Sequence, residues 1–145
     1  MGCFGSNNQV GENKVVARKF SFTNPVICRF CGGASCKHED WTRCENPAIQ
    51  GLHSNWITAS LIASQRLSSR LIKEHNIVRQ FNELGVTAVF NLQEPGEHPH
   101  CGHGIDHKVG FSYNPEELYQ GGVHFYNFHW EDLTNPSFDM AMNVV

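Results

Sequence analysis

An acidic residue that follows an aromatic stretch is the first candidate for chemistry in this sequence of 145 residues. Residues 123–132 read VHFYNFHWED, and their β-branched and aromatic side chains favour a half-buried strand at the start of the stretch. Asp132 comes just past the carboxyl end of that strand, which is where ligands bind in open α/β sheets. Alternatively, Asp132 only opens a turn towards Pro136, since Asp is frequent in turns. This stretch alone leaves both readings open.

Six cysteines form the second group that could do chemistry. Cys28 and Cys31 have the C-x-x-C spacing that holds Zn²⁺ in a knuckle, and glycines follow them. With Cys36 and Cys44, or with His38, they supply enough ligands for a structural zinc site. However, Cys36 and Cys44 do not form a second C-x-x-C pair, and reduced cysteines packed as small apolar groups also explain the pattern. We expect no other cofactor.

The loop over residues 93–113 is rich in potential metal ligands, which are Glu97, His98, His100, Cys101, His103, Asp106 and His107. Their spacing matches no metal motif, so solvated side chains are the simpler interpretation. His100-Cys101 begins like the His-Cys-x5-Arg motif of thiolate phosphatases, in which backbone N–H groups and the Arg hold a phosphate. The position that should hold this Arg is His107, and no other cysteine has Arg at that distance. The chain therefore contains no such phosphate-binding loop.

The elements that position these residues are predicted to alternate between helices and strands. Residues 69–84 carry apolar side chains at helical spacing, after a cap at Ser68 or Ser69 and before a C-capping Gly85. Residues 86–92 are almost continuously apolar and predict a strand covered on both faces. A helix followed at once by a buried strand is half of a βαβ unit, so we expect an α/β fold.

Three further segments are less regular. Residues 49–69 contain a run that fits a short strand or a helical turn equally well. Asn114-Pro115 and Asn135-Pro136 each predict a helix start, with Asn as the cap and Pro at the first helical position. The last helix should carry an apolar stripe of Phe138, Ala141, Met142 and Val145.

Composition excludes several classes of function. Hydrophobic residues make up 40% of the chain, charged residues 17%, and the net charge is −3, all typical of a globular protein. No Lys/Arg cluster predicts nucleic-acid binding, and no apolar run approaches the ~20 residues of a membrane-spanning helix. No secretory signal is visible, so we expect a cytoplasmic protein with reduced cysteines. Nucleotide-binding and serine-hydrolase motifs are absent.

The amino-terminal residues 1–27 are predicted to be a flexible tail because they are rich in Gly, Asn, Ser and Lys without periodicity. The first residues fit the N-myristoylation pattern at Gly2, with Ser6 at the favoured position, and Cys3 could then take a palmitate. One acyl chain binds membranes only marginally, so two would be needed for stable attachment. An ordinary disordered start explains these residues equally well.

Several separate motifs carry a resemblance to a known family, namely residues 28–37, 56–58, 91–98, 101–102, 125–128 and 130–132. In this order and spacing they resemble the protein tyrosine phosphatase domain-containing protein 1 group, in the dual-specificity branch of the cysteine-dependent protein tyrosine phosphatases. The resemblance implies a mostly parallel sheet flanked by helices. It also implies hydrolysis of phosphorylated protein substrates by a Cys thiolate held at a helix N-terminus.

The resemblance further implies that Asp132 is the general acid, with Glu131 as its nearest rival. The nucleophilic Cys and the phosphate-binding Arg have no counterpart here, so we expect this chain alone to be inactive. Residues 28–145 are interpreted as the amino-terminal portion of the phosphatase domain, incomplete at its C-terminus. Two clear strands are too few to bury the predicted helices, and the last helix has no cap signal. The alternative function is a catalytically inactive zinc-binding or membrane-tethered interaction module.

Overall fold

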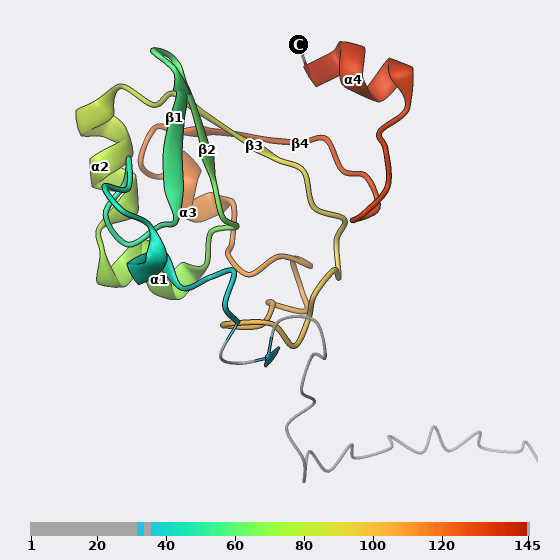
Figure 1. Ribbon diagram of the computed structural model, residues 1–145, viewed down its shortest axis with the longest axis horizontal. Coiled ribbons are helices and arrows are strands. Elements are labelled where there is room, and N and C mark those ends of the chain that lie inside the picture. The colour runs from blue at the N-terminus through green and yellow to red at the C-terminus, as the bar shows by residue number, and fades with distance from the viewer. Residues whose placement is uncertain (1–31, 34–35, 145) are drawn as a thin grey trace, which may run out of the picture.

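The computed structural model describes residues 32–33 and 36–144, and Figure 1 shows how its elements are arranged. In chain order the elements are η2 (Trp41–Arg43), β1 (Ser54–Thr58), β2 (Leu61–Ser64), α1 (Ser69–Glu74), α2 (Ile77–Leu84), β3 (Ala88–Asn91), α3 (Glu116–Tyr119), β4 (His124–Asn127) and α4 (Phe138–Val144). Helices and strands alternate along much of the chain, so the predicted α/β class is confirmed. The predictions for the flexible tail and for Gly2, Cys3, Cys28 and Cys31 lie outside the described residues.

The strands of the described region form two small sheets rather than one. β1 and β2 make an antiparallel hairpin, so the strand alternative for residues 49–69 is the correct one. β3 and β4 pair in parallel, with Ala88 opposite His124 and Asn91 opposite Asn127. The parallel arrangement implied by the family resemblance is therefore seen in one strand pair, and the hairpin adds an antiparallel pair that the resemblance did not imply.

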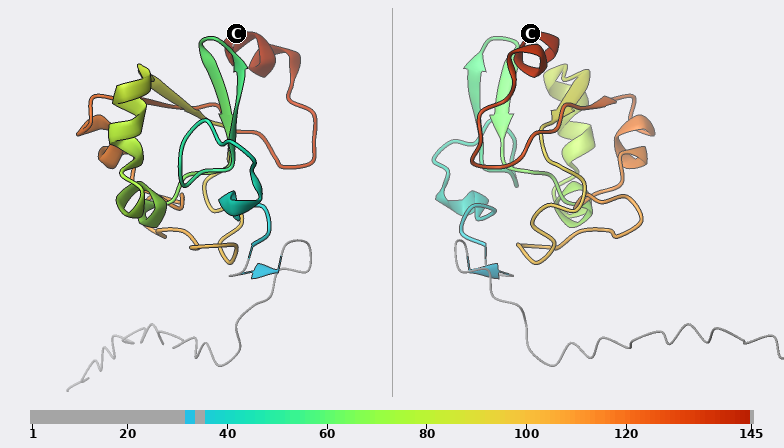
Figure 2. Two further views of the ribbon diagram at one scale, coloured as in Figure 1. Left: turned by 60° about the vertical axis from the view of Figure 1, so that its left-hand side comes forward. Right: turned by 90° about the vertical axis from the view of Figure 1, so that its right-hand side faces the viewer.

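The predicted helix over residues 69–84 is divided into two at its centre. Asn76 has a φ of 51°, in the left-handed region, and separates α1 from α2. The two helices point in different directions (Figures 1 and 2). The outer ends agree with the prediction. The Ser68 hydroxyl accepts a 3.2 Å hydrogen bond from the backbone N–H of Leu71, and Gly85 adopts a left-handed C-cap with a φ of 74°.

The larger apolar cluster of the described residues joins α1, α2 and α3, and Ile62 of the hairpin and Phe125 of β4 pack against it. Its buried members are Ile49, Leu52, Leu67, Leu71, Ile72, Ile77, Phe81, Phe111, Tyr113, Leu118 and Val123. Burial raises the pKa of the Tyr113 hydroxyl. The ring of Phe125, from β4, lies 6.0 Å from that of Tyr113 and 5.9 Å from that of Phe111. One face of β4 is thereby fixed to the core.

The prediction that residues 86–92 form a strand covered on both faces is wrong. β3 is shorter than predicted, and Phe90 leaves 49% of its surface exposed. The Phe90 ring stacks on Tyr126 at 5.3 Å and on Phe128 at 6.0 Å, so aromatic neighbours cover part of this face. The continuous apolar sequence of this strand therefore has another explanation. One face of β3 packs on the core, and the other is an aromatic face that is partly exposed to solvent.

The last helix also differs from its prediction. The backbone N–H of Met140 donates a 3.1 Å hydrogen bond to the Ser137 hydroxyl, so Ser137 rather than Asn135 caps α4. Phe138 and Met142 are 78% and 60% exposed, which means that the predicted apolar stripe is largely uncovered. Among residues 36–144, no helix is long and apolar enough to cross a membrane.

Candidate functional site

The chain segments that follow β3 and β4 leave the sheet side by side. Beyond the strands, the N–H of Phe128 donates to the carbonyl of Asn91 at 2.9 Å, and the N–H of Trp130 donates to that of Leu92 at 3.3 Å. Because parallel strands present their carboxyl ends at one edge, both segments emerge at the same place. Asp132 therefore arrives next to the beginning of the loop over residues 93–113.

A tight turn shapes the start of that loop. The N–H of Glu97 donates to the carbonyl of Glu94 at 3.1 Å, and Gly96 has a φ of 91° at the third position of the turn, after Pro95. This is the sequence and geometry that a type II turn requires. The N–H of Gly96 also donates to the carbonyl of Gly110 at 2.8 Å, which ties the start of the loop to its end. The turn thus presents residues 97 and 98 towards Asp132.

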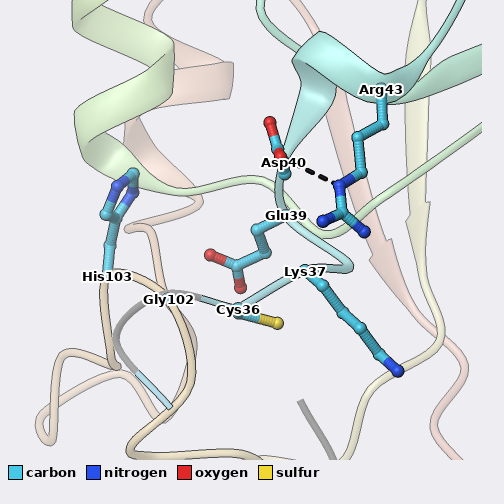
Figure 3. Close-up of a pocket in the computed structure, with 7 residues that line it drawn as sticks. All are labelled: Cys36, Lys37, Glu39, Asp40, Arg43, Gly102 and His103. Atoms are coloured by element: carbon cyan, nitrogen blue, oxygen red, sulfur yellow. Dashed lines mark hydrogen bonds and ion pairs between the residues drawn. The ribbon is translucent and has the colours of Figure 1, made fainter. Parts of the chain in front are cut away.

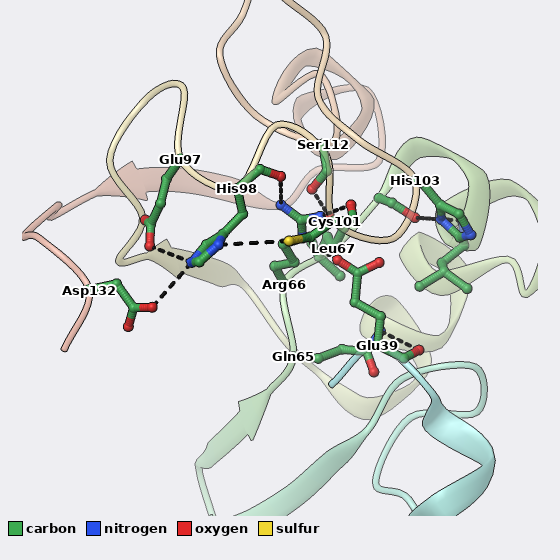
Figure 4. A network of polar contacts seen from close by, with 12 residues as sticks. Glu39, Gln65, Arg66, Leu67, Glu97, His98, Cys101, His103, Ser112 and Asp132 are labelled. Carbon is green, nitrogen blue, oxygen red and sulfur yellow. Dashed lines mark hydrogen bonds and ion pairs between the residues drawn. The ribbon is translucent and has the colours of Figure 1, made fainter. Parts of the chain in front are cut away.

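Asp132 contacts a histidine that also contacts a second carboxylate (Figure 4). The Nε2 atom of His98 lies 3.1 Å from Oδ2 of Asp132 and 3.0 Å from Oε1 of Glu97. The other oxygen, Oδ1, accepts a 2.9 Å hydrogen bond from the N–H of Leu133. The side chain of Asp132 has two partners that orient it and stays 54% exposed. Asp132 opens a turn, as one reading of the sequence expected, and its catalytic role stays a prediction.

The loop over residues 93–113 is held by Arg66, which the sequence patterns did not identify. The Arg66 guanidinium forms an ion pair with Glu39, and each side chain is only 10% exposed. Its Nη1 atom donates to the carbonyl of His98 at 3.3 Å, and its Nη2 atom donates to the carbonyl of Cys101. Arg66 therefore connects the chain before β1 to the loop beside Asp132 (Figure 4). Arg66 belongs to no recognisable sequence motif, so no sequence signal indicated this role.

The cysteines that the structure describes fall into two different environments. Cys36 and Cys101 are 9% and 6% exposed and pack together in a buried cluster of their own. Cys44 lies instead beside the hairpin, with its sulfur 3.6 Å from the carbonyl oxygen of Ser54 and 4.0 Å from Oδ1 of Asn55. The structure thus places Cys36 beside Cys101, which the sequence pattern had grouped with the potential ligands of the loop.

The remaining loop ligands are dispersed. His103 uses Nδ1 to contact the Ser68 hydroxyl at 2.6 Å, and Asp106 accepts from the N–H of Lys108 at 2.8 Å within a turn. His100 and His107 are exposed. The seven potential ligands of the loop are therefore not assembled as a unit, and of these only Glu97 and His98 gather with Asp132 within the described residues.

A surface cavity of about 290 Å³ lies between residues 36–43 and the turn at Gly102 (Figure 3). It is lined by Cys36, Lys37, Glu39, Asp40, Arg43, Gly102 and His103. The lining mixes both signs of charge, and hydrogen bonding from the Thr42 hydroxyl lowers the pKa of Asp40. Asp132 is not part of this lining, so the cavity and the candidate acid are separate features.

Comparison with known proteins adds one consistent result. No family model and no solved structure matches this chain. Among curated proteins, the chain is 40% identical over 117 residues to "Protein tyrosine phosphatase domain-containing protein 1" of Danio rerio. It is 39% identical over 118 residues to the protein of that name of Mus musculus. Each of these matches covers 79% of this chain. The protein of the same name of Bos taurus is 36% identical over 124 residues, or 83% of this chain.

The matched region corresponds to 16% of the length of each of these relatives, so this chain spans about one sixth of them. The names of the relatives agree with the motifs from residue 28 onwards that carry the family resemblance. Over about four-fifths of its length, the chain is therefore a relative of the protein tyrosine phosphatase domain-containing protein 1 group.

Proposed function

We propose that this chain supplies the general-acid segment of a cysteine-dependent protein phosphatase of the tyrosine or dual-specificity type, with Asp132 as the proton donor. The observation that carries the proposal is the parallel pairing of β3 with β4, which puts an exposed Asp132 at the carboxyl edge of the pair. The names of the relatives support the same class of chemistry. The proposed substrate is a phosphorylated protein.

The proposed reaction needs a thiolate, a phosphate-binding cation and a proton donor. The thiolate attacks phosphorus, the bond from phosphorus to the substrate oxygen breaks, and Asp132 gives its proton to that leaving oxygen. Water then attacks the thiophosphate, Asp132 takes up the proton of the water, and the thiolate is released with inorganic phosphate. None of the six cysteines here has Arg at the required distance, so we propose that the thiolate and its Arg come from sequence outside this chain.

His98 has a supporting role in this proposal. Its Nε2 atom bridges the carboxylates of Asp132 and Glu97, and its backbone carbonyl is held by Arg66. The imidazole therefore fixes the direction of the Asp132 side chain without covering it. We expect His98→Ala to weaken this orientation, and we treat His98 as a positioning residue.

The test uses a longer protein in which this chain is followed by the segment that supplies the Cys and Arg. Loss of a general acid slows departure of a poor leaving group by roughly 10²–10⁴-fold. Asp132→Ala should therefore reduce kcat strongly on a phosphopeptide and far less on an aryl phosphate whose leaving group needs no proton. Phosphopeptide binding should persist, because Asp132 does not hold the phosphate. The matched controls are Glu131→Ala, one residue away, and Asp139→Ala in α4.

Two results would count against the proposal. If Glu131→Ala shows the leaving-group dependence and Asp132→Ala does not, the assignment within the loop is wrong by one residue. If the unmodified longer protein hydrolyses neither substrate, an inactive interaction module becomes the better interpretation. The 145-residue chain by itself should hydrolyse neither substrate, because it contains no Cys with Arg at the required spacing.

A further inference from the structure

We propose that Glu97, His98 and Asp132 form a reversible binding site for Zn²⁺. Among the described residues, each side chain of this trio offers one ligand atom, and the three atoms lie within 4.8 Å of one another. An imidazole nitrogen with two carboxylate oxygens suits Zn²⁺, whereas Mg²⁺ and Ca²⁺ prefer oxygen ligands alone. Zinc binding by the trio does not depend on the proposed phosphatase activity.

The first argument is the distance between the ligand atoms. The Nε2 atom of His98 lies 3.0 Å from Oε1 of Glu97 and 3.1 Å from Oδ2 of Asp132, and Figure 4 shows both acidic side chains directed at the imidazole. Zinc binds nitrogen and oxygen at about 2.0–2.2 Å in a tetrahedral arrangement, so neighbouring ligand atoms of a zinc ion are about 3.3–3.6 Å apart. The observed spacing is close to this value, and small side-chain rotations would make room for the ion.

The second argument is the single hydrogen that Nε2 of His98 can carry. In the neutral and in the protonated imidazole, Nε2 has at most one N–H group. That hydrogen can point in good geometry at only one of the two carboxylate oxygens that lie next to it. A metal ion has no such restriction, because it binds all three atoms at once. The alternative is an ion pair in which the imidazole alone holds both carboxylates.

The third argument is that the other polar atoms of the trio are already held. Oε2 of Glu97 accepts a 3.1 Å hydrogen bond from the backbone N–H three positions earlier, and Oδ1 of Asp132 accepts a 2.9 Å bond from the next N–H. The Nδ1 atom of His98 faces the sulfur of Cys101 at 3.8 Å. Metal ligands are usually oriented by such contacts on their second polar atom. Each residue of the trio therefore turns its remaining ligand atom towards one shared point.

The exposure of the trio indicates an exchangeable ion rather than a structural one. The side chains of His98 and Asp132 are 42% and 54% exposed, and that of Glu97 is 18% exposed. Zinc sites with three protein ligands keep a fourth position for water, and these exposed side chains leave room for it. The loop is also held without an ion, because Arg66 donates to the carbonyl of His98.

The site has a consequence for catalysis that rests on the proposed function. Because Oδ1 of Asp132 accepts from the backbone, Oδ2 is the oxygen that would carry the catalytic proton, and Oδ2 is also the atom next to His98. A zinc ion on Oδ2 takes the lone pair that would bind this proton. Asp132 could then neither give a proton to the leaving oxygen nor take one from water. Zinc should therefore switch off the acid step.

The first experiment measures zinc binding by the 145-residue chain under reducing conditions, in competition with a chromogenic zinc indicator. Glu97→Gln and Asp132→Asn each remove one ligand charge at nearly constant size. Loss of a residue that only orients a ligand weakens metal binding by about 10–100-fold, so loss of a ligand should weaken this site at least as much. The matched controls are Glu94→Gln and Glu131→Gln, in the same two segments but outside the trio.

Cysteines also bind zinc, so the site is measured as the difference between the variants and their controls. The proposal is overturned if Glu97→Gln and Asp132→Asn bind zinc as tightly and in the same amount as the controls, because the trio is then an ion pair only. It is also overturned if the unsubstituted chain takes up no zinc from buffered Zn²⁺.

A second experiment avoids substitutions and any misfolding that they cause. The unsubstituted chain is treated with diethyl pyrocarbonate, which modifies accessible imidazoles, and the modified histidines are identified by peptide mass spectrometry. Zn²⁺ should protect His98 and leave the modification of the exposed His100 and His107 unchanged, and Mg²⁺ should protect none of them. Equal modification of His98 with and without Zn²⁺ overturns the site.

The consequence for catalysis is tested in the longer protein that contains the Cys and Arg. Zn²⁺ should lower turnover of a phosphopeptide and have far less effect on an aryl phosphate whose leaving group needs no proton. Equal inhibition of both substrates would place the ion on the thiolate and overturn this consequence. If the protein hydrolyses neither substrate without Zn²⁺, the proposed function fails, and the zinc titration of the 145-residue chain still decides the site.

Discussion

Replacement of Arg66 by Met should destabilise the protein strongly, because the substitution removes the cation but keeps most of the apolar stem. Arg66 and Glu39 have side chains only 10% exposed, so the remaining carboxylate would be buried without its charge partner. Breaking a buried ion pair on one side costs about 3–5 kcal/mol. The carbonyls of His98 and Cys101 would also lose their side-chain donor, and a lost hydrogen bond of this kind costs about 1 kcal/mol. Because two such hydrogen bonds are lost, we expect a total loss of about 5–7 kcal/mol.

The matched control is Arg79→Met in α2. Arg79 pairs with Glu83 at 2.7 Å, but the side chains are 78% and 58% exposed. Exposed pairs at this helical spacing contribute only about 0.3–0.5 kcal/mol. The comparison keeps the residue types and the substitution the same, and it changes the burial of the pair and the two bonds to backbone carbonyls that only Arg66 makes.

Urea denaturation followed by circular dichroism would give the free energy of unfolding of each variant. The double variant Arg66→Met with Glu39→Leu should recover much of the loss, because it removes the carboxylate that Arg66→Met leaves unpaired. The reasoning is refuted if Arg66→Met costs less than about 1 kcal/mol, as an exposed pair would. It is also refuted if the double variant is less stable than Arg66→Met, since the carboxylate would then not be the source of the cost.

Three further predictions concern the core, the loop and the amino terminus. Leu118→Ala should lower the free energy of unfolding by about 2–5 kcal/mol in urea denaturation, because Leu118 is fully buried; a loss below about 1 kcal/mol would contradict its place in the core. Gly85→Ala should lower the free energy of unfolding by about 1 kcal/mol, because φ is 74° but the space around Gly85 is open. Gly102→Ala should lower it clearly more, because the new methyl group would overlap the Glu39 carboxylate. Equal losses in the same assay would show that Glu39 moves aside freely. Gly2→Ala should release the protein from the membrane fraction of cells that acylate it, and an unsubstituted protein found entirely in the soluble fraction would exclude acylation.

Local signals in the sequence predicted the local features of the fold. The cap at Ser68, the left-handed Gly85 and the start of α3 after Asn114 each depend on residues within a few positions of one another. The break at Asn76 was missed because the apolar spacing continues across it and only the packed structure shows two helix directions. The exposed face of Phe90 was missed for a related reason, since its cover comes from Tyr126 and Phe128.

The candidate site shows the same division between local and distant information. Asp132 could be proposed from the strand that precedes it, because its position depends on a short stretch of chain. The contact of His98 with Asp132 and the packing of Cys36 against Cys101 depend on which distant segments the fold brings together. A single sequence does not show which residues from distant segments contact each other. The role of Arg66 could not be predicted for the same reason, although its hydrogen bonds to the carbonyls of His98 and Cys101 hold the loop in place.

The two strand pairs differ in how soon each can form during synthesis. The hairpin of β1 and β2 closes through a short turn, so it can fold as soon as both strands leave the ribosome. In the parallel pair, Asn91 and its partner Asn127 are 36 positions apart. Closing that longer loop costs more entropy, and the pairing cannot begin until β4 has been made. During this interval β3 exposes an unpaired edge and the aromatic ring of Phe90. Chaperones bind nascent chains that expose such surfaces.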